Sequence, residues 1–400
     1  MLPASISDYR ELARRRLPRM IFDYIDGGSY AEVTLARNVA DMAALPLRQR
    51  VMRDMRRLQM GTSLFGQSLS MPVVLAPVGL AGMYGRRGEV QAARAAATAG
   101  VPFTLSTVGI CPVEEVAPVA PPWFQLYMLK DRGYMRELLA RAKAAGSPVL
   151  VFTVDLPAPG TRHRDVRSGL TGSPPTPWAH LERLWQGAIR PGWVWDVWLH
   201  GRPHAFGSVM GAVPQARGFN DFWGWIGANF DRSVTFRDID WVRESWDGPI
   251  VLKGILDAED ARDAVRAGAD GLVVSNHGGR QLDGVVSSIA ALPRIADAVG
   301  GDLTVMMDGG IRSGLDVLKA LALGARGVMI GRAWAYALAA GGQPMIERML
   351  ASLRAELTTA MILTGCTDIA EADGRLLDTE QYQAFHTSRE TPIDRGGSCR

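Results

Sequence analysis

The feature that most constrains this chain is an alternation of short apolar runs with helical segments, repeated eight times from residue 72 onward. The apolar runs cover residues 72–78, 102–107, 123–127, 149–155, 249–254, 271–276, 303–308 and 327–331. Runs of this length are typical of strands that are buried on both faces of a parallel sheet. Eight consecutive strand–helix units favour an α/β fold of the (β/α)8, or TIM-barrel, type over a doubly wound open sheet, which usually has fewer strands.

Capping residues support this assignment of helices and strands. Helical patterns over 88–100, 132–146, 258–268 and 314–324 lie between the apolar runs, and Asp131, Asp257 and Ser313 stand where helix N-caps are expected. A glycine precedes several strands, and we expect left-handed helix caps at Gly100, Gly146, Gly268, Gly300 and Gly324. No G-x-G-x-x-G motif follows a strand, which argues against a nicotinamide-binding fold.

Composition excludes several classes of protein. The 44 Lys and Arg residues nearly balance 41 Asp and Glu residues, so no overall basic field favours nucleic acid. The sequence contains no stretch of about 18 uninterrupted apolar residues, so it predicts no membrane-spanning helix. Cys111, Cys366 and Cys399 are too far apart for a disulfide framework or a zinc site, so we expect no metal and a reducing cytoplasm. The N-terminal segment lacks the apolar core of a secretory signal.

One connection is much longer than the others. Roughly 80 residues separate the fourth strand from a helix expected near 238–245, and such a loop is usually functional or disordered. It contains seven of the eleven tryptophans, and residues 161–217 contain seven arginines against three acidic residues. The tryptophans are Trp178, Trp185, Trp193, Trp195, Trp198, Trp223 and Trp225. Tryptophan with arginine is typical of a bilayer interface, whereas an aromatic lid or a subunit contact is the alternative.

We therefore expect a single domain over residues 1–370, with a Trp-rich insertion at roughly 170–232 after the fourth strand. Residues 371–400 are expected to form a C-terminal tail.

Polar side chains stand at the ends of most predicted strands. In a barrel these ends share one rim, where active sites lie. The densest group is SNHGGRQLD, residues 275–283, in which His277 is a candidate base that Asp155 of the fourth strand orients. Arg162 and Arg280 are candidates for binding a substrate carboxylate. Lys253 suits either a Schiff base or a charge beside an electron-accepting ring.

The last two strands lead into glycine-rich turns that predict an anion site. Gly309, Gly310 and Arg312 follow the seventh strand, and Gly331 and Arg332 follow the eighth. Such turns let backbone N–H groups approach a phosphate at a helix N-terminus, and an arginine can clamp it bidentately. Barrels frequently bind phosphate at this place.

Long motifs identify a family. They include FDYIDGG (22–28), LAPVGLAGMYGRRGEVQAARAA (75–96), FTVDLPAPGTRHRD (152–165), SNHGGRQLDGV (275–285), DGGIRSGLDVLKALALGA (308–325) and IGRA (330–333). From residue 7 to about 370 the chain resembles the FMN-dependent α-hydroxy acid oxidases and dehydrogenases. The resemblance implies FMN as cofactor and assigns Tyr24, Arg162 and Arg280 to the substrate carboxylate, Tyr127 to the substrate, and His277 with Asp155 to proton abstraction. The cofactor-binding set that it implies is Ala76, Pro77, Val78, Gly79, Ser106, Gln125, Thr153, Lys253, Ser275, Asp308, Gly309, Gly310, Arg312, Gly331 and Arg332.

The resemblance also implies an activity. It predicts oxidation of a small L-2-hydroxy acid, L-lactate to pyruvate, with electrons passed through FMN to a quinone of the respiratory chain. Gly79, where oxidases of the family tend to carry Ala, favours a dehydrogenase. The insertion lies where membrane-bound members attach, which predicts peripheral association with the cytoplasmic face of the inner membrane, and family members are commonly tetramers. Hydride transfer and a carbanion route need the same residues.

Four alternatives stay open. Within the family these are a dehydrogenase of a larger acid such as mandelate, and an oxygen-using oxidase. Outside it, Lys253 could act covalently in a phosphate-binding barrel isomerase or aldolase. The last is a non-catalytic scaffold that docks on a membrane.

Overall fold

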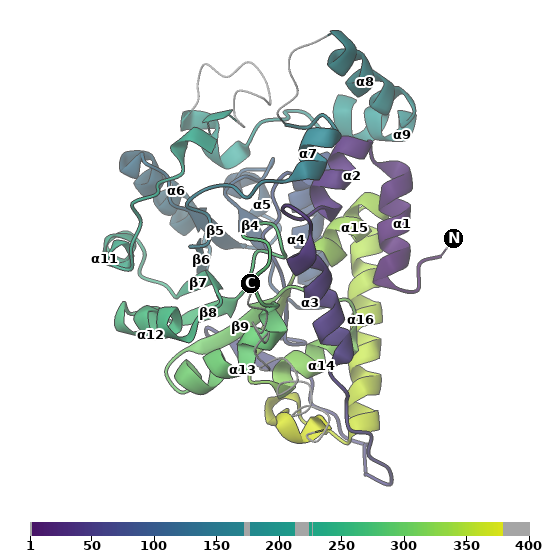
Figure 1. Ribbon diagram of the computed structural model, residues 1–400, viewed down its shortest axis with the longest axis vertical. Coiled ribbons are helices and arrows are strands. Elements are labelled where there is room, and N and C mark those ends of the chain that lie inside the picture. The colour runs from purple at the N-terminus through teal and green to yellow at the C-terminus, as the bar shows by residue number, and fades with distance from the viewer. Residues whose placement is uncertain (1, 172–176, 213–223, 226, 379–400) are drawn as a thin grey trace, which may run out of the picture.

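The eight predicted strands form one parallel barrel (Figure 1). The computed structural model describes residues 2–171, 177–212, 224–225 and 227–378. Hydrogen-bonded neighbours follow the order β3-β10-β9-β8-β7-β6-β5-β4, and a parallel bridge between Leu75 and Phe103 joins β3 to β4. The predicted (β/α)8 barrel is therefore confirmed. Its strands are β3 (Val73–Leu75), β4 (Thr104–Ser106), β5 (Trp123–Tyr127), β6 (Leu150–Thr153), β7 (Ile250–Ile255), β8 (Gly271–Val274), β9 (Thr304–Asp308) and β10 (Gly327–Ile330).

The period of two along each strand separates an inner from an outer core. Val151, Val251 and Val273 belong to the cluster that fills the barrel, whereas their neighbours in sequence pack against the helices outside. The hairpin of β1 (Thr62–Leu64) and β2 (Gln67–Leu69) contributes Leu64 and Leu69 to the inner cluster. Residues two positions beyond the inner valines therefore face inward again, one layer closer to the carboxyl ends of the strands.

Helices surround the barrel. After β3 to β10, respectively, come α4 (Gly88–Ala99), α5 (Val113–Val116), α6 (Arg132–Ala144), α11 (Asp238–Arg243), α12 (Ala258–Arg266), α13 (Ser288–Val299), α14 (Gly314–Ala322) and α15 (Arg332–Gly341). The N-terminal segment adds α1 (Ile6–Arg16), α2 (Arg19–Asp26) and α3 (Val33–Ala44), and α16 (Gln343–Thr364) follows the barrel. Short 3-10 turns are η1 (Ala81–Met83), η4 (Ile369–Glu371) and η5 (Gly374–Leu376).

The predicted N-caps are confirmed, because Asp131, Asp257 and Ser313 each accept a hydrogen bond from a backbone N–H in the first turn. Four of the predicted glycine caps have the expected positive φ: Gly100, Gly146, Gly268 and Gly324. The prediction for Gly300 was wrong. Its φ of −65° continues the right-handed turn of α13, and the carbonyl of Val299 accepts from the N–H groups of Asp302 and Leu303 instead.

The long connection between β6 and β7 is helical where it is described. It contains α7 (His163–Arg167), α8 (Pro177–Ala188), α9 (Pro191–Trp193), the π-helical turn η2 (Val194–Leu199) and the 3-10 segment η3 (Gly207–Ala212). Figure 1 shows α8 and α9 at one end of the molecule, beyond α2 and α7. Trp223, the rest of 213–223, residues 172–176, residue 226 and the tail over 379–400 with Cys399 lie outside the described residues.

None of the helices in the described ranges combines the length and apolarity needed to cross a membrane. The division into one domain over 1–370 and a tail over 371–400 stays a prediction. Residues 371–378 of that tail lie against the body of the protein, where Leu377 forms a bridge with Leu47.

Candidate active site

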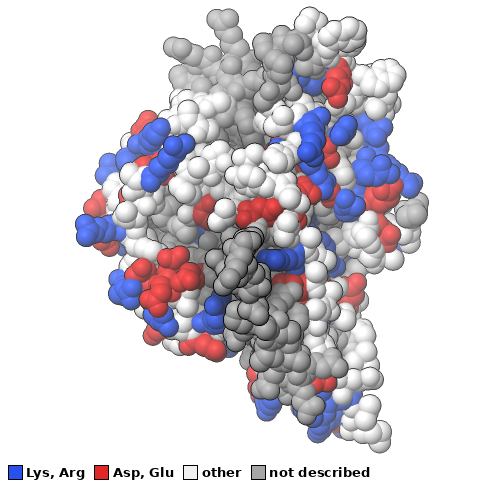
Figure 2. All heavy atoms as spheres, in the orientation of Figure 1, with Lys and Arg blue, Asp and Glu red and all other residues white. Residues whose placement is uncertain are grey.

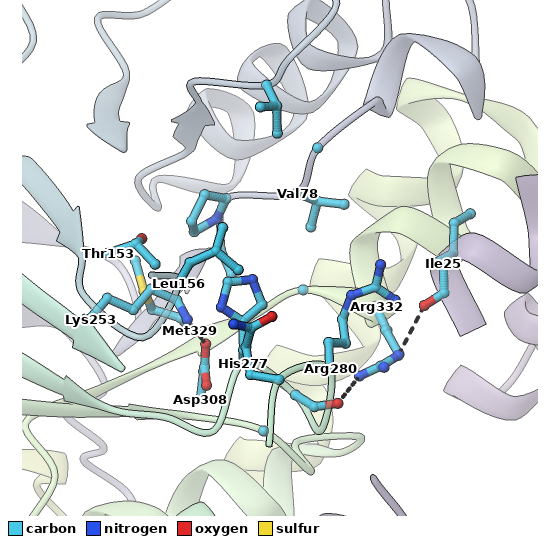
Figure 3. Close-up of a pocket in the computed structure, with 18 of the residues that line it drawn as sticks. Ile25, Val78, Thr153, Leu156, Lys253, His277, Arg280, Asp308, Met329 and Arg332 are labelled. Carbon is cyan, nitrogen blue, oxygen red and sulfur yellow. Dashed lines mark hydrogen bonds and ion pairs between the residues drawn. The ribbon is translucent and has the colours of Figure 1, made fainter. Parts of the chain in front are cut away.

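A cavity lies at the carboxyl ends of the barrel strands and gathers most of the predicted site (Figure 3). Seventeen predicted residues line it: Tyr24, Ala76, Pro77, Val78, Gly79, Tyr127, Thr153, Arg162, Lys253, His277, Arg280, Asp308, Gly309, Gly310, Arg312, Gly331 and Arg332. Thr153, Lys253 and Asp308 stand two positions beyond Val151, Val251 and Met306, so strand alternation places them on the inward face. Ser106, Gln125, Asp155 and Ser275 do not line the cavity but contact one another or residues that do.

His277 is fixed in the cavity by a partly buried carboxylate. Its Nδ1 lies 2.9 Å from Oδ1 of Asp155, which leaves Nε2 for a substrate. His277 has a φ of +57°, a conformation that is uncommon for a residue with a side chain, and its backbone N–H donates to Ser275 Oγ at 3.0 Å. Burial raises the pKa of Asp155, but His277 and Lys253 outweigh burial and keep it below its usual value. A histidine paired in this way is suited to accept a proton.

Two arginines meet at the ring of Tyr24. The guanidinium carbon of Arg162 lies 5.3 Å from the ring centroid, and that of Arg280 lies 4.8 Å from it. Arg280 Nη1 donates to the carbonyls of Tyr24 (2.6 Å) and Gly27 (2.8 Å), whereas Arg162 Nη1 has no hydrogen bond within the described residues and lies 3.4 Å from Oδ2 of the buried Asp165. Burial, and then the charge of Arg162, lower the pKa of Arg280. Two adjacent, partly buried cations with the single carboxylate of Asp165 beside them favour an anionic ligand.

Tyr127 faces the same part of the cavity from the end of β5. Burial raises the pKa of its hydroxyl, which therefore remains protonated and able to donate a hydrogen bond. Its ring packs edge to face on Phe230 with a centroid separation of 5.5 Å.

Lys253 and Asp308 form a buried ion pair on the opposite wall, with Nζ to Oδ2 at 2.7 Å. Lys253 also donates to Ser275 Oγ at 2.9 Å, and its side chain is 5% exposed. The carboxylate of Asp308 therefore balances the charge of this ammonium within the protein. In Figure 3 the pair lies on one side of His277, and Arg280 and Arg332 lie on the other.

The glycine turn after β9 has the form of an anion site. Gly309 and Gly310 have φ values of +91° and +87°, and a Cβ on Gly310 would lie 2.1 Å from the carbonyl oxygen of Asn38. Only glycine therefore fits this turn, which leads past Arg312 into α14.

The sequence predicts that Arg332 binds a phosphate, but in the structure its guanidinium also binds three backbone carbonyls. Its Nε, Nη1 and Nη2 donate to the carbonyls of Ile25 (3.0 Å), Gly278 (2.8 Å) and Gly27 (2.8 Å). Burial lowers its pKa to about 10. Three of its five N–H groups thus tie α2 and the His277 loop to α15, and two remain for an anion.

The residues present fit an FMN group. Nε2 of Gln125 and Oδ1 of Asp308 are buried and lack hydrogen-bond partners within the described part of the chain. Buried polar atoms are nearly always paired, so a polar ligand that accepts from the amide and donates to the carboxylate accounts for both. A pyrimidine-like ring edge and a polyol chain have these properties, and the glycine turn with Arg312 suits a terminal phosphate.

Sequence reasoning missed several wall residues, among them Tyr84, Val108, Leu156, Phe230, Gln281 and Met329. Tyr84 is buried, and its hydroxyl donates to the Gly79 carbonyl at 2.5 Å. Val108 determines the space at Gly79, because a Cβ there would lie 2.8 Å from Val108 Cγ2. The glycines on both sides of Met83 and Tyr84 were the available signal for Tyr84, whereas the others are apolar or loop residues without a distinguishing pattern.

Known proteins resemble the chain over nearly its whole length. A family model described as FMN-dependent dehydrogenase matches residues 13–379. An L-lactate dehydrogenase of Xanthomonas campestris pv. campestris (strain B100) is 59% identical over 386 residues, which cover 96% of this chain and 99% of that protein. An L-lactate dehydrogenase of Caulobacter sp. (strain K31) is 58% identical over 379 residues, covering 94% and 99%, respectively.

Solved structures agree with this assignment. The monotopic membrane protein (S)-mandelate dehydrogenase superimposes with a TM-score of 0.87 at 31% identity and covers 94% of this chain and 99% of its own. Mandelate oxidase with (S)-4-hydroxymandelic acid gives a TM-score of 0.80 at 39% identity, covering 94% and 98%. The family model and the full-length relatives lead to one conclusion: this chain belongs to the FMN-dependent dehydrogenase family and uses FMN to oxidise a small hydroxy acid.

Proposed function

We propose that the chain oxidises L-lactate to pyruvate and passes the electrons to a membrane quinone. The observation that carries the proposal is the arrangement of Arg162 and Arg280 beside the His277–Asp155 pair. The two cations suit a carboxylate, and the imidazole suits the proton of a neighbouring hydroxyl. The relatives at 58–60% identity that are named L-lactate dehydrogenase support lactate as the substrate.

Each of the site residues has its own role in the proposed reaction. Arg162 and Arg280 bind the substrate carboxylate, and Tyr24, whose ring both guanidiniums contact, shapes that subsite. The protonated hydroxyl of Tyr127 donates to a substrate oxygen. Nε2 of His277 takes the hydroxyl proton, and Asp155 stabilises the imidazolium through Nδ1.

FMN, when bound, accepts the two electrons that leave the substrate carbon. The backbone of residues 76–79, with Thr153 and Gln125, forms its binding surface in this proposal. The Lys253 ammonium, held by Asp308 and Ser275, stabilises negative charge on the ring. This pairing favours an electrostatic role for Lys253 over a Schiff base.

Mandelate is the second candidate substrate, because the similar solved structures are a mandelate dehydrogenase and mandelate oxidases. Comparing kcat/KM for L-lactate and (S)-mandelate with an artificial electron acceptor tests the choice. We expect the value for L-lactate to be higher. A higher value for (S)-mandelate would overturn the assignment of lactate. Hydrogen peroxide formed in air in step with the product would indicate the oxidase instead of the dehydrogenase that Gly79 favours.

We also propose that α8 and η2, whose Trp195 is 65% exposed, attach the protein to the cytoplasmic surface of the inner membrane. Trp178, Leu181, Leu184 and Trp185 recur at helical spacing on α8, and all four are exposed, Trp178 to 79% and Trp185 to 65%. Exposed apolar groups of this size mark an interaction site. Figure 2 shows mostly uncharged side chains among the described residues at this end of the molecule. The structural relative described as monotopic supports a membrane as the partner.

Two leucines provide the test of attachment. Leu181→Asp with Leu184→Asp introduces two charges on the exposed face of α8 without disturbing a buried contact. We expect the enzyme to move from the membrane pellet to the soluble fraction with lactate oxidation by an artificial acceptor retained. Leu363→Asp, a change at a half-exposed leucine of α16, is the matched control. A double variant that still sediments with membranes would refute this anchor.

A homotetramer remains part of the proposal on the family resemblance alone. Light scattering of the purified enzyme measures its mass directly, and a monomeric mass would exclude it.

A further inference from the structure

We propose that a second cavity, behind Tyr84, binds the ring of the acceptor quinone. The inference rests on the proposed function in that it takes a quinone as the acceptor. The cavity has a volume of about 1060 Å³, slightly above the usual range of about 300–1,000 Å³ for small-molecule sites. It lies among α1, α4, α15 and the α9–η2 segment. None of the residues assigned above to FMN or to the hydroxy acid lines it.

Tyr84 separates the two cavities, because it lines both of them. Its hydroxyl donates to the carbonyl of Gly79 at 2.5 Å, and Gly79 belongs to the turn that we assign to the flavin. A single buried side chain thus connects the wall of the second cavity to the flavin-binding turn. Electron transfer slows steeply with distance, so a cavity one side chain away from the flavin-binding turn is well placed for an acceptor.

The chemistry of the walls suits a quinone. Tyr84, Val90, Trp193 and Leu338 are buried residues that offer apolar and aromatic surface to a flat ring. Six arginines also line the cavity, against the two acidic residues Glu115 and Asp196. Cationic N–H donors hydrogen-bond to quinone oxygens and bind more strongly as these gain negative charge on reduction.

The arginines are only partly neutralised. Arg87 pairs with Glu115 (Nε to Oε1, 2.6 Å), Arg15 pairs with Glu11 (Nε to Oε1, 2.7 Å), and Arg86 lies 3.5 Å from Asp196. Arg15 and Arg16 come from the last turn of α1, and Figure 2 shows basic side chains gathered over that end of the helix, below α9. Arg94 and Arg190 complete the set.

The cavity also continues toward the proposed membrane surface. Ile189 lines it, is 45% exposed, and directly follows the last residue of α8. A quinone whose tail remains in the bilayer can therefore place its ring in the cavity. Two electrons pass from the reduced flavin to the quinone, whose oxygens gain two protons from the flavin and solvent, and the flavin returns to its oxidised state.

A binding measurement tests the site without turnover. The holoenzyme is irradiated with a photoreactive azido-benzoquinone of short chain, and labelled peptides are mapped by mass spectrometry. We expect labels within 84–94 or 189–197 that excess unlabelled quinone suppresses. Labels elsewhere would overturn the proposal. Protection by glycerol phosphate but not by quinone would also overturn it and assign the cavity to an anionic headgroup.

A kinetic measurement isolates the arginines. Arg86→Glu with Arg94→Glu should raise the half-saturating concentration of a soluble quinone about tenfold or more when it reoxidises photoreduced enzyme. Because the quinone is neutral, the substitutions do not act by long-range attraction. Flavin reduction by L-lactate should be unchanged, and Arg326→Glu at the opposite end of the barrel should leave both steps unchanged. Equal quinone kinetics in the double variant would refute the site. Photoreduction makes the test independent of lactate, so an enzyme that lactate fails to reduce would refute the proposed function alone.

Discussion

Replacing Asp155 with Asn tests the central contact of the site. Asn preserves the shape of the side chain and can still accept from Nδ1 of His277 at 2.9 Å, but it carries no charge. A hydrogen bond to a charged group contributes about 1–1.5 kcal/mol more than a neutral one, which sets a lower limit of about tenfold on the rate. Two unit charges about 4 Å apart at an effective dielectric of about 20 interact by about 4 kcal/mol, which sets an upper limit of about a thousandfold.

The assay is the anaerobic reduction of bound FMN by L-lactate in a stopped-flow spectrophotometer. It observes proton abstraction and flavin reduction without the step to the acceptor. We expect the limiting rate of flavin reduction to decrease by a factor of about ten to a thousand, with the flavin still bound. The control is Asp41→Asn, a buried carboxylate that accepts from Ser287 away from the cavity. A rate within twofold of the wild-type rate in Asp155→Asn would refute the role of the pair.

Three further predictions follow from the ion pairs and turns. Lys253→Met leaves the carboxylate of Asp308 buried without its cation, so we expect a loss of about 3 kcal/mol in the free energy of unfolding in urea, together with slower flavin reduction. Arg312→Ala should weaken FMN binding roughly 10- to 100-fold, measured by fluorescence of released flavin, with the stability of the apoprotein unchanged, whereas Arg332→Ala should lower that stability because three carbonyls lose their donor. The buried Asp26 accepts from Arg10, Arg164 and Tyr336, which overcome burial and lower its pKa to about 2. Its stabilisation of roughly 2 kcal/mol is therefore complete above pH 4 and is lost as the pH falls through 2, so urea midpoints of the wild type and Asp26→Asn should differ at pH 6 and converge toward pH 2.

The barrel was predictable because its strands carry the signal in their own residues. A strand between a packed interior and a layer of helices must be largely apolar on both faces, and most of the eight runs satisfy that condition. The run of β4 is an exception, because the buried polar residues Thr104 and Ser106 alternate with the apolar Phe103 and Leu105. Strand alternation then places Thr153, Lys253 and Asp308 at one rim. Gly300 shows the limit of such local rules, since a glycine after a helix also serves where the chain continues in a right-handed turn.

The parts of the site that escaped prediction depend on contacts between distant segments. Arg332 donates to carbonyls of residues 25, 27 and 278, and no local pattern shows that α2 lies against the loop of His277. Tyr84 gains its place between two cavities from the packing of α1, α15 and the α9–η2 segment around it. The family resemblance supplied roles for residues such as Tyr24, but the geometry between the elements had to come from the structure.

The most direct test of the account is an anaerobic titration of the purified, FMN-loaded enzyme with L-lactate, followed through the visible absorbance of the flavin. We predict that one equivalent of L-lactate per flavin bleaches the protein and yields one pyruvate, whereas D-lactate leaves the spectrum unchanged. A flavin that stays oxidised in excess L-lactate would contradict the account.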